Sequence, residues 1–421
     1  MTKQQENEAL LGGSRVLDLC DYKGLLCGKI LGGLGADVVK IESPGGDLAR
    51  DIGPFYHDIP DREKSLFWFA LNTNKRGITL NIESVDGQII FKRLVEMYDI
   101  VVESFTPGYM DQIGLGYKAL SEINPGIIMT SITPFGQTGP YKDCKASDMI
   151  VWAMGGMMYL CGDSECPPVT VTCPQAYLNA ASDGAIGSMM ALYYREISGE
   201  GQQVDVSAQQ SVASNLARNA QPTWDLLKRN QMRVGSDYLR ASTWTVEPQT
   251  WPCKDGYVTF RLGPGGFMAR YFLALLNWME EEGMNVDFLK SIDWNQWDID
   301  KATQDELDKI MEPIGRFILT HNKMELYEGA IEKGVMLYPV NTAKDLLGDK
   351  QLAARNFWVR VEHTELDDSL IYPGPFTKLS ESSCAIQRRA PLIGEHNEEI
   401  YEKELGLSRE NLFILKQAGV I

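Results

Sequence analysis

The chain has 421 residues, of which 44% are hydrophobic, 10% aromatic and 23% charged. This is the composition of a globular protein, and the length exceeds the size at which one core usually keeps growing, so at least two domains are expected. The net charge of -17 excludes a broad basic surface for nucleic acid. A small phosphate pocket built from a few cations stays compatible with that charge.

The first fifteen residues, MTKQQENEALLGGSR, lack the apolar core of a signal peptide, and no apolar run approaches the roughly 18 residues that span a bilayer. We therefore expect a cytoplasmic protein without membrane contact, whose eight cysteines are reduced thiols. Cys161, Cys166 and Cys173 lie close together but lack C-x-x-C spacing, and the chain has only four histidines. No metal site is predicted from them.

Apolar strands alternate with amphipathic helices through the first half of the chain. The predicted strands are Arg15–Leu19, Asp37–Glu42, Gly77–Ile82, Ile100–Glu103, Gly126–Ser131 and Gln203–Ser207. The predicted helices between them include Leu25–Leu34, Gln88–Met97 and Tyr117–Ile123. The alternation predicts an α/β fold with a doubly wound parallel sheet.

The common nucleotide and hydrolase motifs do not fit this chain. The glycines of GGLGAD end the first predicted helix instead of opening it, which excludes the dinucleotide fingerprint and a nicotinamide cofactor. No Walker loop is present, and GDSEC does not match the G-x-S-x-G elbow of serine hydrolases.

The pattern changes after a helical run over Ser211–Lys228. A strand at Gly256–Leu262 and helices at Phe267–Glu282 and Gln304–Glu325 predict a second, smaller domain. The sequence LGPGGF at 262–267 is flexible by composition, and a plain turn is favoured there over a ligand lid. The expected organisation is a large domain begun by residues 1–228, a linker and small domain at 229–333, and a return to the large domain at 334–421.

Several stretches together resemble one family, the class III CoA-transferases, which includes the alpha-methylacyl-CoA racemases. They are GSRVLDL, LGGLGADVVKIESPGGD, LNTNKRGITLNI, VVESFTPGYMDQIGLGY, INPGIIMTSITPFGQTGPY, YYREISGEGQQVDVS, PLIGEHN and the terminal AGVI. The resemblance implies a Rossmann-like large domain built from both chain ends, with a small α+β domain between them. It also implies a dimer of interlocked rings.

The family's chemistry depends on an aspartate at the mouth of the helix before REISGEGQ. Counting back from Arg195 without a gap places this aspartate at position 177, where this chain has Tyr177. A phenol with a pKa near about 10 is scarcely ionised at neutral pH and forms no anhydride. Asp183 is the nearest acid in the sequence, but six residues turn it away along a helix, and a first-turn acid or helix cap is its simpler interpretation.

Other positions of the family's site have also changed. Tyr22 and Lys23 stand where relatives have a small residue, Ser43 replaces an arginine that meets the adenine, Ser104 replaces an asparagine, and Ser147 stands where racemases need histidine. Racemase activity is therefore not expected.

The residues that match CoA-lining positions are Lys75, Arg76, Phe105 and Lys145, and the site that they form is either a retained or a vestigial CoA pocket. A solvated basic turn is the alternative for Lys75 and Arg76.

The resemblance therefore implies a chain that has the fold of the family without its nucleophile. We expect the non-catalytic subunit of a heteromeric CoA-transferase, associated as a heterodimer or heterotetramer with a homologous catalytic subunit. Such an enzyme would move CoA from an acyl-CoA such as succinyl-CoA to an aromatic succinate-type acid. CoA thioesters would be substrates, bound mainly at the partner, and no tightly bound cofactor is expected. The alternatives are an active transferase that uses a different acid, and a CoA-ester-binding regulatory protein.

Overall fold

The computed structural model describes residues 9–216, 220–228, 233, 235–240, 244–262 and 268–421. The chain forms two compact units. Unit 1 comprises Met1–Met157, Thr170–Gln221 and Lys350–Ile421, and unit 2 comprises Met158–Val169 and Pro222–Asp349. Most of the LGPGGF segment, residues 263–267, lies outside the described residues.

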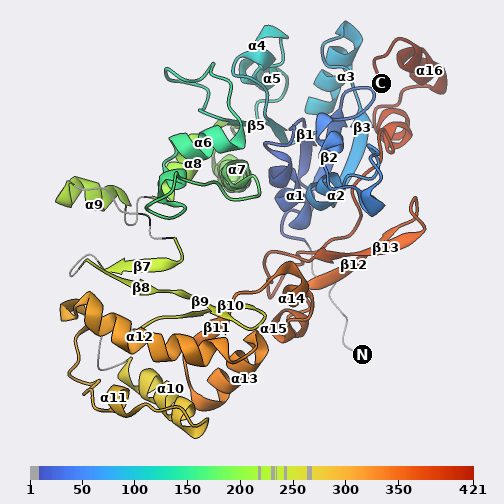
Figure 1. Ribbon diagram of the computed structural model, residues 1–421. Helices are drawn as coiled ribbons and strands as arrows, with labels where there is room; N and C mark the ends of the chain where they lie inside the picture. The colour runs from blue at the N-terminus through green and yellow to red at the C-terminus, as the bar shows by residue number, and fades with distance from the viewer. Residues whose placement is uncertain (1–8, 217–219, 229–232, 234, 241–243, 263–267) are drawn as a thin grey trace. The chain divides into compact units, whose positions relative to one another are not determined.

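A six-stranded parallel sheet forms the centre of unit 1 (Figure 1). Its strand order is β3 (Lys75–Thr79), β2 (Asp37–Glu42), β1 (Arg15–Asp18), β4 (Ile100–Glu103), β5 (Ile128–Thr133) and β6 (Gln203–Ser207). All strand pairs are parallel. The order 3-2-1-4-5-6 is that of the Rossmann fold, so the predicted doubly wound α/β sheet is confirmed.

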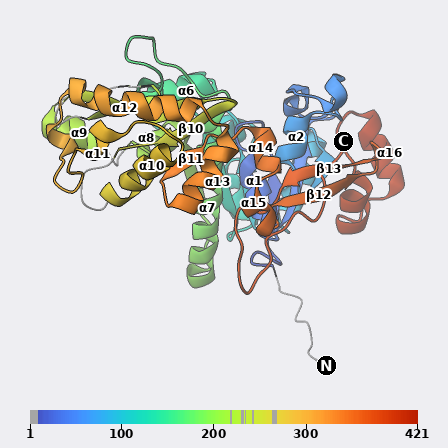
Figure 2. The ribbon, with the colours of Figure 1, turned by 60° about the horizontal axis from the view of Figure 1, so that its bottom comes forward.

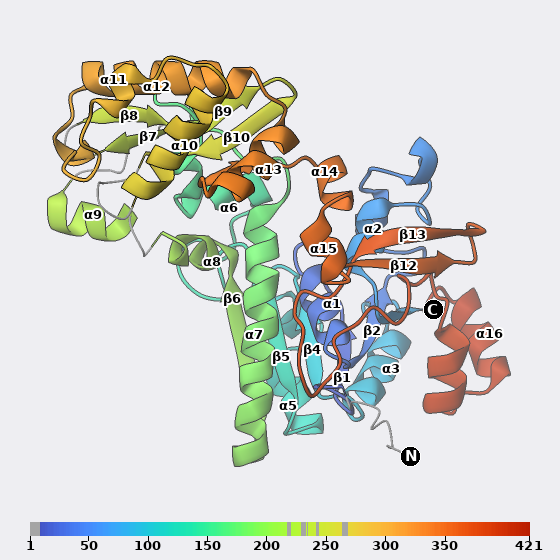
Figure 3. The ribbon, with the colours of Figure 1, turned by 90° about the horizontal axis from the view of Figure 1, so that it is seen from below.

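The helices of unit 1 pack on both faces of this sheet. They are α1 (Leu25–Gly33), α2 (Leu66–Leu71), α3 (Val85–Val95), α4 (Tyr109–Gln112), α5 (Tyr117–Ile123), α6 (Asp148–Met154), α7 (Gln175–Ser198), α8 (Ala208–Ser214), α15 (Lys350–Ala354) and α16 (Arg409–Gln417), with a π-helical turn at Glu399–Glu404 and short 3-10 helices at Leu48–Asp51 and Tyr56–Asp58. Figure 3 shows α7 running along β5 and β6, which it contacts together with α1. Its small residues Ala181, Gly184 and Ala185 are buried, which allows this close approach.

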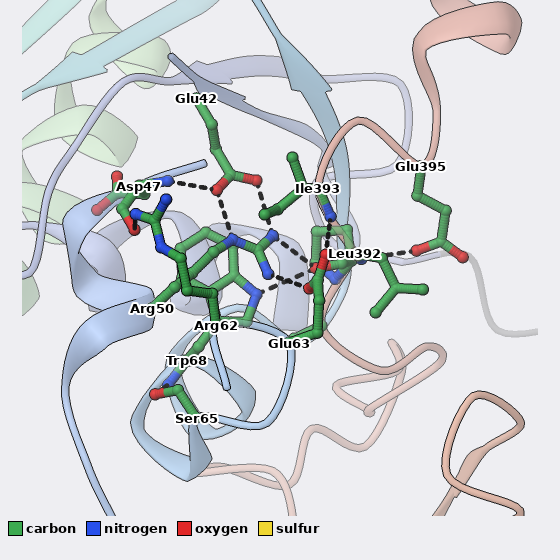
Figure 4. A network of polar contacts seen from close by, with 12 residues as sticks. Glu42, Asp47, Arg50, Arg62, Glu63, Ser65, Trp68, Leu392, Ile393 and Glu395 are labelled. Carbon is green, nitrogen blue, oxygen red and sulfur yellow. Dashed lines mark hydrogen bonds and ion pairs between the residues drawn. The ribbon is translucent and has the colours of Figure 1, made fainter. Parts of the chain in front are cut away.

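The C-terminal segment returns to unit 1 and binds the β2–β3 side of the sheet. The hairpin of β12 (Trp358–His363) and β13 (Asp368–Pro373) lies beside α2 (Figure 2) and shares a core with Trp68. Beyond it, Arg50 stacks on Trp68 and binds Glu42 through two hydrogen bonds of 2.6 and 2.8 Å (Figure 4). Arg50 also donates to the Pro391 carbonyl at 2.9 Å. This buried arginine thereby joins sequence positions that are hundreds of residues apart.

Unit 2 has a three-stranded antiparallel sheet with helices packed against it. The sheet has the order β11 (Leu337–Pro339), β10 (Gly256–Phe260), β9 (Thr250–Cys253), and β7 (Asp237–Arg240) pairs with β8 (Thr245–Pro248). The helices are α9 (Ala220–Leu227), which begins at the end of unit 1, α10 (Ala269–Glu281), α11 (Asp287–Lys290), α12 (Gln304–Leu319), α13 (Lys323–Lys333) and α14 (Ala343–Leu347), with 3-10 turns at Met157–Leu160 and Ile299–Lys301. Its core is separate from that of unit 1 and is rich in aromatic side chains. Unit 2 is the smaller α+β unit.

The unit boundaries differ from those expected at 228/229 and 333/334. Residues 334–349 belong to unit 2 because β11 pairs with β10, and 158–169 belong to it as well. The helix expected over Gln304–Glu325 is two helices, since Asn322 and Glu325 form a capping box that starts α13. The run expected over Ser211–Lys228 likewise contains α8 and α9 as separate helices. In the described part of the chain, no helix is both long and apolar enough to cross a membrane.

Candidate functional site

The site predicted from the sequence lies where the loops after β1, β4 and β5 approach the start of α7. Strand order reverses between β1 and β4, and open α/β sheets bind ligands at the carboxyl ends of strands beside such a switch point. The loop after β1 contributes Tyr22, the loop after β5 contributes Ala146, and the first turn of α7 contributes Tyr177.

Tyr177 is the third residue of α7, and its side chain is only 1% exposed. The phenol hydroxyl donates a hydrogen bond of 3.1 Å to the Ala146 carbonyl. Its ring meets the Tyr22 ring edge-on, with 5.6 Å between centroids. Burial, with smaller contributions from Tyr22 and Asp148, raises the pKa of Tyr177 well above the ordinary value of a phenol. The side chain therefore stays protonated and fills the helix mouth.

Asp148, the first residue of α6, caps the N-terminus of α7. Its carboxylate accepts a hydrogen bond of 2.8 Å from the Tyr177 amide, and the Ala176 amide also donates to it. The expectation that Asp183 caps the helix or lies in its first turn is wrong. Asp183 is exposed, and α7 already starts at Gln175, two turns earlier. No local sequence pattern pointed to Asp148, because the Tyr177 amide that it accepts from lies 29 residues away in the sequence.

Two of the changed positions near Tyr177, Ser104 and Lys23, contact the same residue, Asp21. Ser104, after β4, donates to Asp21 at 2.8 Å, and the Asp21 amide donates back to the Ser104 hydroxyl at 2.9 Å. Lys23 pairs with the same Asp21 carboxylate. These contacts join the loops after β1 and β4 across the switch point, where a ligand would otherwise meet both loops.

Phe105 and Ser43 line a pocket of about 440 Å³ at the carboxyl ends of β2, β3, β1 and β4. Glu42 and Glu83 also line it, whereas none of the described lining residues is a lysine or an arginine. Glu42 is neutralised by Arg50 and Glu83 accepts from the Tyr109 hydroxyl. Without a lysine or an arginine in the described walls, this pocket provides no charge-assisted contact to a phosphate.

Lys75 and Arg76 lie at the amino end of β3, where the register pairs Lys75 with Val38. The Lys75 ammonium donates to Asp18 at 2.7 Å, to the Leu25 carbonyl at 2.8 Å and to Asn72 at 2.9 Å. These three acceptors match its three protons. Burial lowers the pKa of Lys75, and the nearby Asp18 carboxylate opposes this.

Arg76 pairs with three carboxylates, those of Asp37, Glu399 and Glu404, at 2.5 to 2.8 Å. Two of them come from the C-terminal segment. Because Lys75 and Arg76 are both buried and paired with residues of the fold, their geometry supports a structural role. It speaks against both a CoA-phosphate contact and a solvated basic turn.

Three other residues near the predicted site differ in their exposure to solvent. Lys145 and Ser147 are exposed on the loop that follows β5, and Lys145 does not line the pocket of Phe105. Glu103, which the sequence analysis did not select, is buried at the end of β4. Burial raises the pKa of Glu103 to about 7, although the Phe105 amide donates to its carboxylate at 2.7 Å. Among the described residues, no group of three His, Cys, Asp or Glu side chains is placed to hold a metal ion.

Comparisons with known proteins agree with the resemblance found in the sequence. The family model described as CoA-transferase family III matches residues 11–397. The chain is 34% identical to the succinyl-CoA:(R)-benzylsuccinate CoA-transferase subunit BbsE of Thauera aromatica, with 92% of each chain covered. It is 31% identical to the succinyl-CoA--L-malate CoA-transferase beta subunit of Chloroflexus aurantiacus, with 98% of each chain covered.

A solved structure supports the fold independently. The crystal structure of a CAIB/BAIF family protein from Brucella suis superposes with a TM-score of 0.80 at 26% identity, covering 94% of this chain and 99% of that one. The family model and the two relatives each match nearly the whole chain. The chain belongs to CoA-transferase family III.

Proposed function

We propose that this chain is the non-catalytic subunit of a heteromeric class III CoA-transferase, associated with a homologous subunit that carries the aspartate. The observation on which the proposal rests is Tyr177, a buried and hydrogen-bonded phenol at the position of the family's nucleophile. In the family, that carboxylate attacks the acyl-CoA thioester and expels the CoA thiolate. The thiolate then attacks the acyl-aspartyl anhydride, which releases the donor acid and leaves an aspartyl-CoA thioester, and the acceptor acid repeats these steps in reverse to leave as its CoA ester. A protonated phenol cannot form this anhydride.

The surroundings of Tyr177 support the same conclusion. The first amides of α7 would be the natural donors to negative charge that develops at the helix mouth, but Asp148 accepts from two of them. The pocket around Phe105 is lined by carboxylates at its charged positions, which disfavours the phosphates of CoA. Substrate binding and chemistry are therefore assigned to the partner subunit.

An apolar face on α7 supports association with a second subunit. Five large residues at helical spacing are between 51% and 72% exposed: Ile186, Met190, Tyr193, Tyr194 and Ile197. Their spacing places them on one stripe of the helix, and a contiguous apolar stripe on a water-soluble unit marks a protein interface. We assign this stripe to the contact with the catalytic subunit in an interlocked heterodimer or heterotetramer.

The substrate assignment follows the relative from Thauera aromatica, whose name gives succinyl-CoA and (R)-benzylsuccinate. We propose an acyl-CoA such as succinyl-CoA as donor and an aromatic succinate as acceptor. We also propose that this chain acts in the cytoplasm.

Coexpression with a homologous chain that has the aspartate tests the assignment. We expect the two chains to purify together in equal amounts and to exchange CoA between succinate and benzylsuccinate, while this chain alone is inactive. A homodimer with substantial turnover would contradict the proposal. Tight binding of a CoA ester by this chain without any copurifying homologue would instead favour a regulatory protein.

A further inference from the structure

Unit 1 contains a second cavity, of about 410 Å³, away from the mouth of α7. It lies between α1, the middle of α7 and the loop that leads from β13 to Ile386. Its walls are mainly apolar and include Leu26, Ile30, Ala185, Met189 and Phe376. The volume falls within the roughly 300–1,000 Å³ of sites that hold small molecules.

One cation, Lys29 of α1, lines this cavity. In the described part of the chain, no carboxylate forms an ion pair with Lys29, in contrast to Lys40, which pairs with Asp47 at 3.0 Å. Burial lowers the pKa of Lys29, and the positive charge of Lys75 adds to the effect. A cation on an apolar wall without a counterion is a costly arrangement that an anionic ligand would relieve.

A second polar group in the cavity wall also lacks a partner. Thr73 lines the cavity, its side chain is 1% exposed, and its hydroxyl has no hydrogen-bond partner among the described residues. The neighbouring Asn74 amide, in contrast, donates to the Ala385 carbonyl at 2.6 Å and accepts from the Gln387 amide at 2.7 Å. Asn74 therefore holds the wall loop in place, while the hydroxyl of Thr73 is closed off inside the wall and does not reach the cavity.

We propose that this cavity binds an amphipathic monocarboxylate, with the carboxylate at Lys29 and an apolar chain or ring along α1 and α7. One cation suits one carboxylate, and the apolar walls disfavour a polyphosphate such as CoA. Ala185 lies eight residues beyond Tyr177 on α7, about 12 Å along the helix axis, so this site is separate from the helix mouth. Ile186 of the α7 stripe also lines this cavity, so a subunit docked on that stripe would border the ligand.

Calorimetric titration of the full chain with octanoate at neutral pH tests the site, with octanamide as a neutral probe of the same shape. We expect octanoate to bind and octanamide to bind at least about tenfold more weakly. Lys29→Met should weaken octanoate binding by at least about tenfold, whereas Lys29→Arg should stay within about threefold. Octanoate that does not bind at millimolar concentration, or that binds Lys29→Met as tightly as the parent, would overturn the proposal.

Gly33 offers a variant that fills the cavity without backbone strain. A Cβ at Gly33 would lie 3.9 Å from the Cys384 thiol and from the Phe376 ring, an ordinary contact distance. Gly33→Leu should therefore direct its side chain into the cavity and lose octanoate binding, and a thermal denaturation beside the parent checks that the variant is folded. Since Cys384 also lines the cavity, octanoate should slow its alkylation in the parent and leave the rate unchanged in Gly33→Leu. Equal rates with and without octanoate in the parent would contradict the placement of the ligand.

Discussion

Two regions of unit 1 differ in the charge of their buried polar side chains. On the β2–β3 side of the sheet, the buried cations Arg50, Lys75 and Arg76 are each paired with carboxylates, and two of them bind the C-terminal segment. At the mouth of α7, where the family has a reactive carboxylate, a neutral phenol is buried instead. The cations of a family motif can thus have a purely structural role. At the mouth of α7, position 177 carries no negative charge.

The largest expected effect concerns Lys75, whose partner Asp18 is completely buried. Lys75→Met should lower the free energy of unfolding by about 3–5 kcal/mol, because it leaves a buried carboxylate unpaired. Urea denaturation of the full chain measures this change. Adding Asp18→Asn should restore most of the loss, since the Asn oxygen can still accept from the Cys20 amide.

Lys64→Met serves as the matched control, because Lys64 and Asp61 form an exposed pair in which the two side chains are 30% and 42% exposed. Its effect should stay below about 1 kcal/mol. If Lys75→Met were equally mild, and if CoA stabilised the parent but not this variant, Lys75 would belong to a ligand site and the comparison between the two regions would fail.

Glu103 should make unit 1 less stable as the pH rises from about 4.5 to about 7. Burial raises the pKa of Glu103 to about 7 from an ordinary 4.5, so in this interval the unfolded chain releases a proton that the folded chain keeps. Stability therefore falls through this window and levels off above it. Glu103→Gln should remove that fall and stabilise the protein at pH 8 by about 1–3 kcal/mol.

Denaturation midpoints at pH 5 and pH 8 measure this effect. Glu122→Gln, at an exposed position, is the control and should leave the pH profile unchanged. A Glu103→Gln profile that parallels that of the parent would show that Glu103 ionises normally in the folded protein.

A smaller effect is expected from Tyr177→Phe, which removes the hydrogen bond to the Ala146 carbonyl and keeps the ring contact with Tyr22. The expected loss is about 0.5–1.5 kcal/mol. Tyr193→Phe, at a position 72% exposed, should have no measurable effect. Thermal denaturation compares the two variants, and equal melting temperatures would mean that the phenol hydroxyl is not engaged as described.

The smallest effect, no gain in activity, is expected when Tyr177→Asp restores the carboxylate. The α7 amides would still be occupied by Asp148, and Ser43 would still provide no cation for the adenine. Thioester exchange by a heteromer whose catalytic aspartate is mutated gives the measurement. A rate near that of the intact enzyme would mean that one residue separates this chain from a catalyst.

Local sequence patterns predicted strands β2 and β4 well, because each is a short, mainly apolar run. Asp37–Glu42 and Ile100–Glu103 have the predicted bounds. Strand β3 begins two residues before its predicted start, at Lys75 and Arg76, because these cations are buried by ion pairs that no local pattern reveals.

The candidate site was less predictable. Position 177 followed from gap-free counting, yet the cap at Asp148 and the burial of Lys75 depend on partners that are 29 and 57 residues away in the sequence. Such long-range pairs are decided by the tertiary fold. Sequence resemblance could identify the positions of the site. Which of its charged side chains are buried and paired depends on the three-dimensional arrangement.

Trapping of the acyl-enzyme tests most directly whether this chain takes part in the chemistry. The coexpressed complex would be incubated with succinyl-CoA and then with hydroxylamine, which converts an acylated carboxylate into a hydroxamate that peptide mass spectrometry can locate. We expect the hydroxamate on the aspartate of the partner subunit and an unmodified Tyr177 peptide. A hydroxamate on Asp148, Asp183 or Glu103 of this chain would show that it supplies its own nucleophile, and would contradict the account.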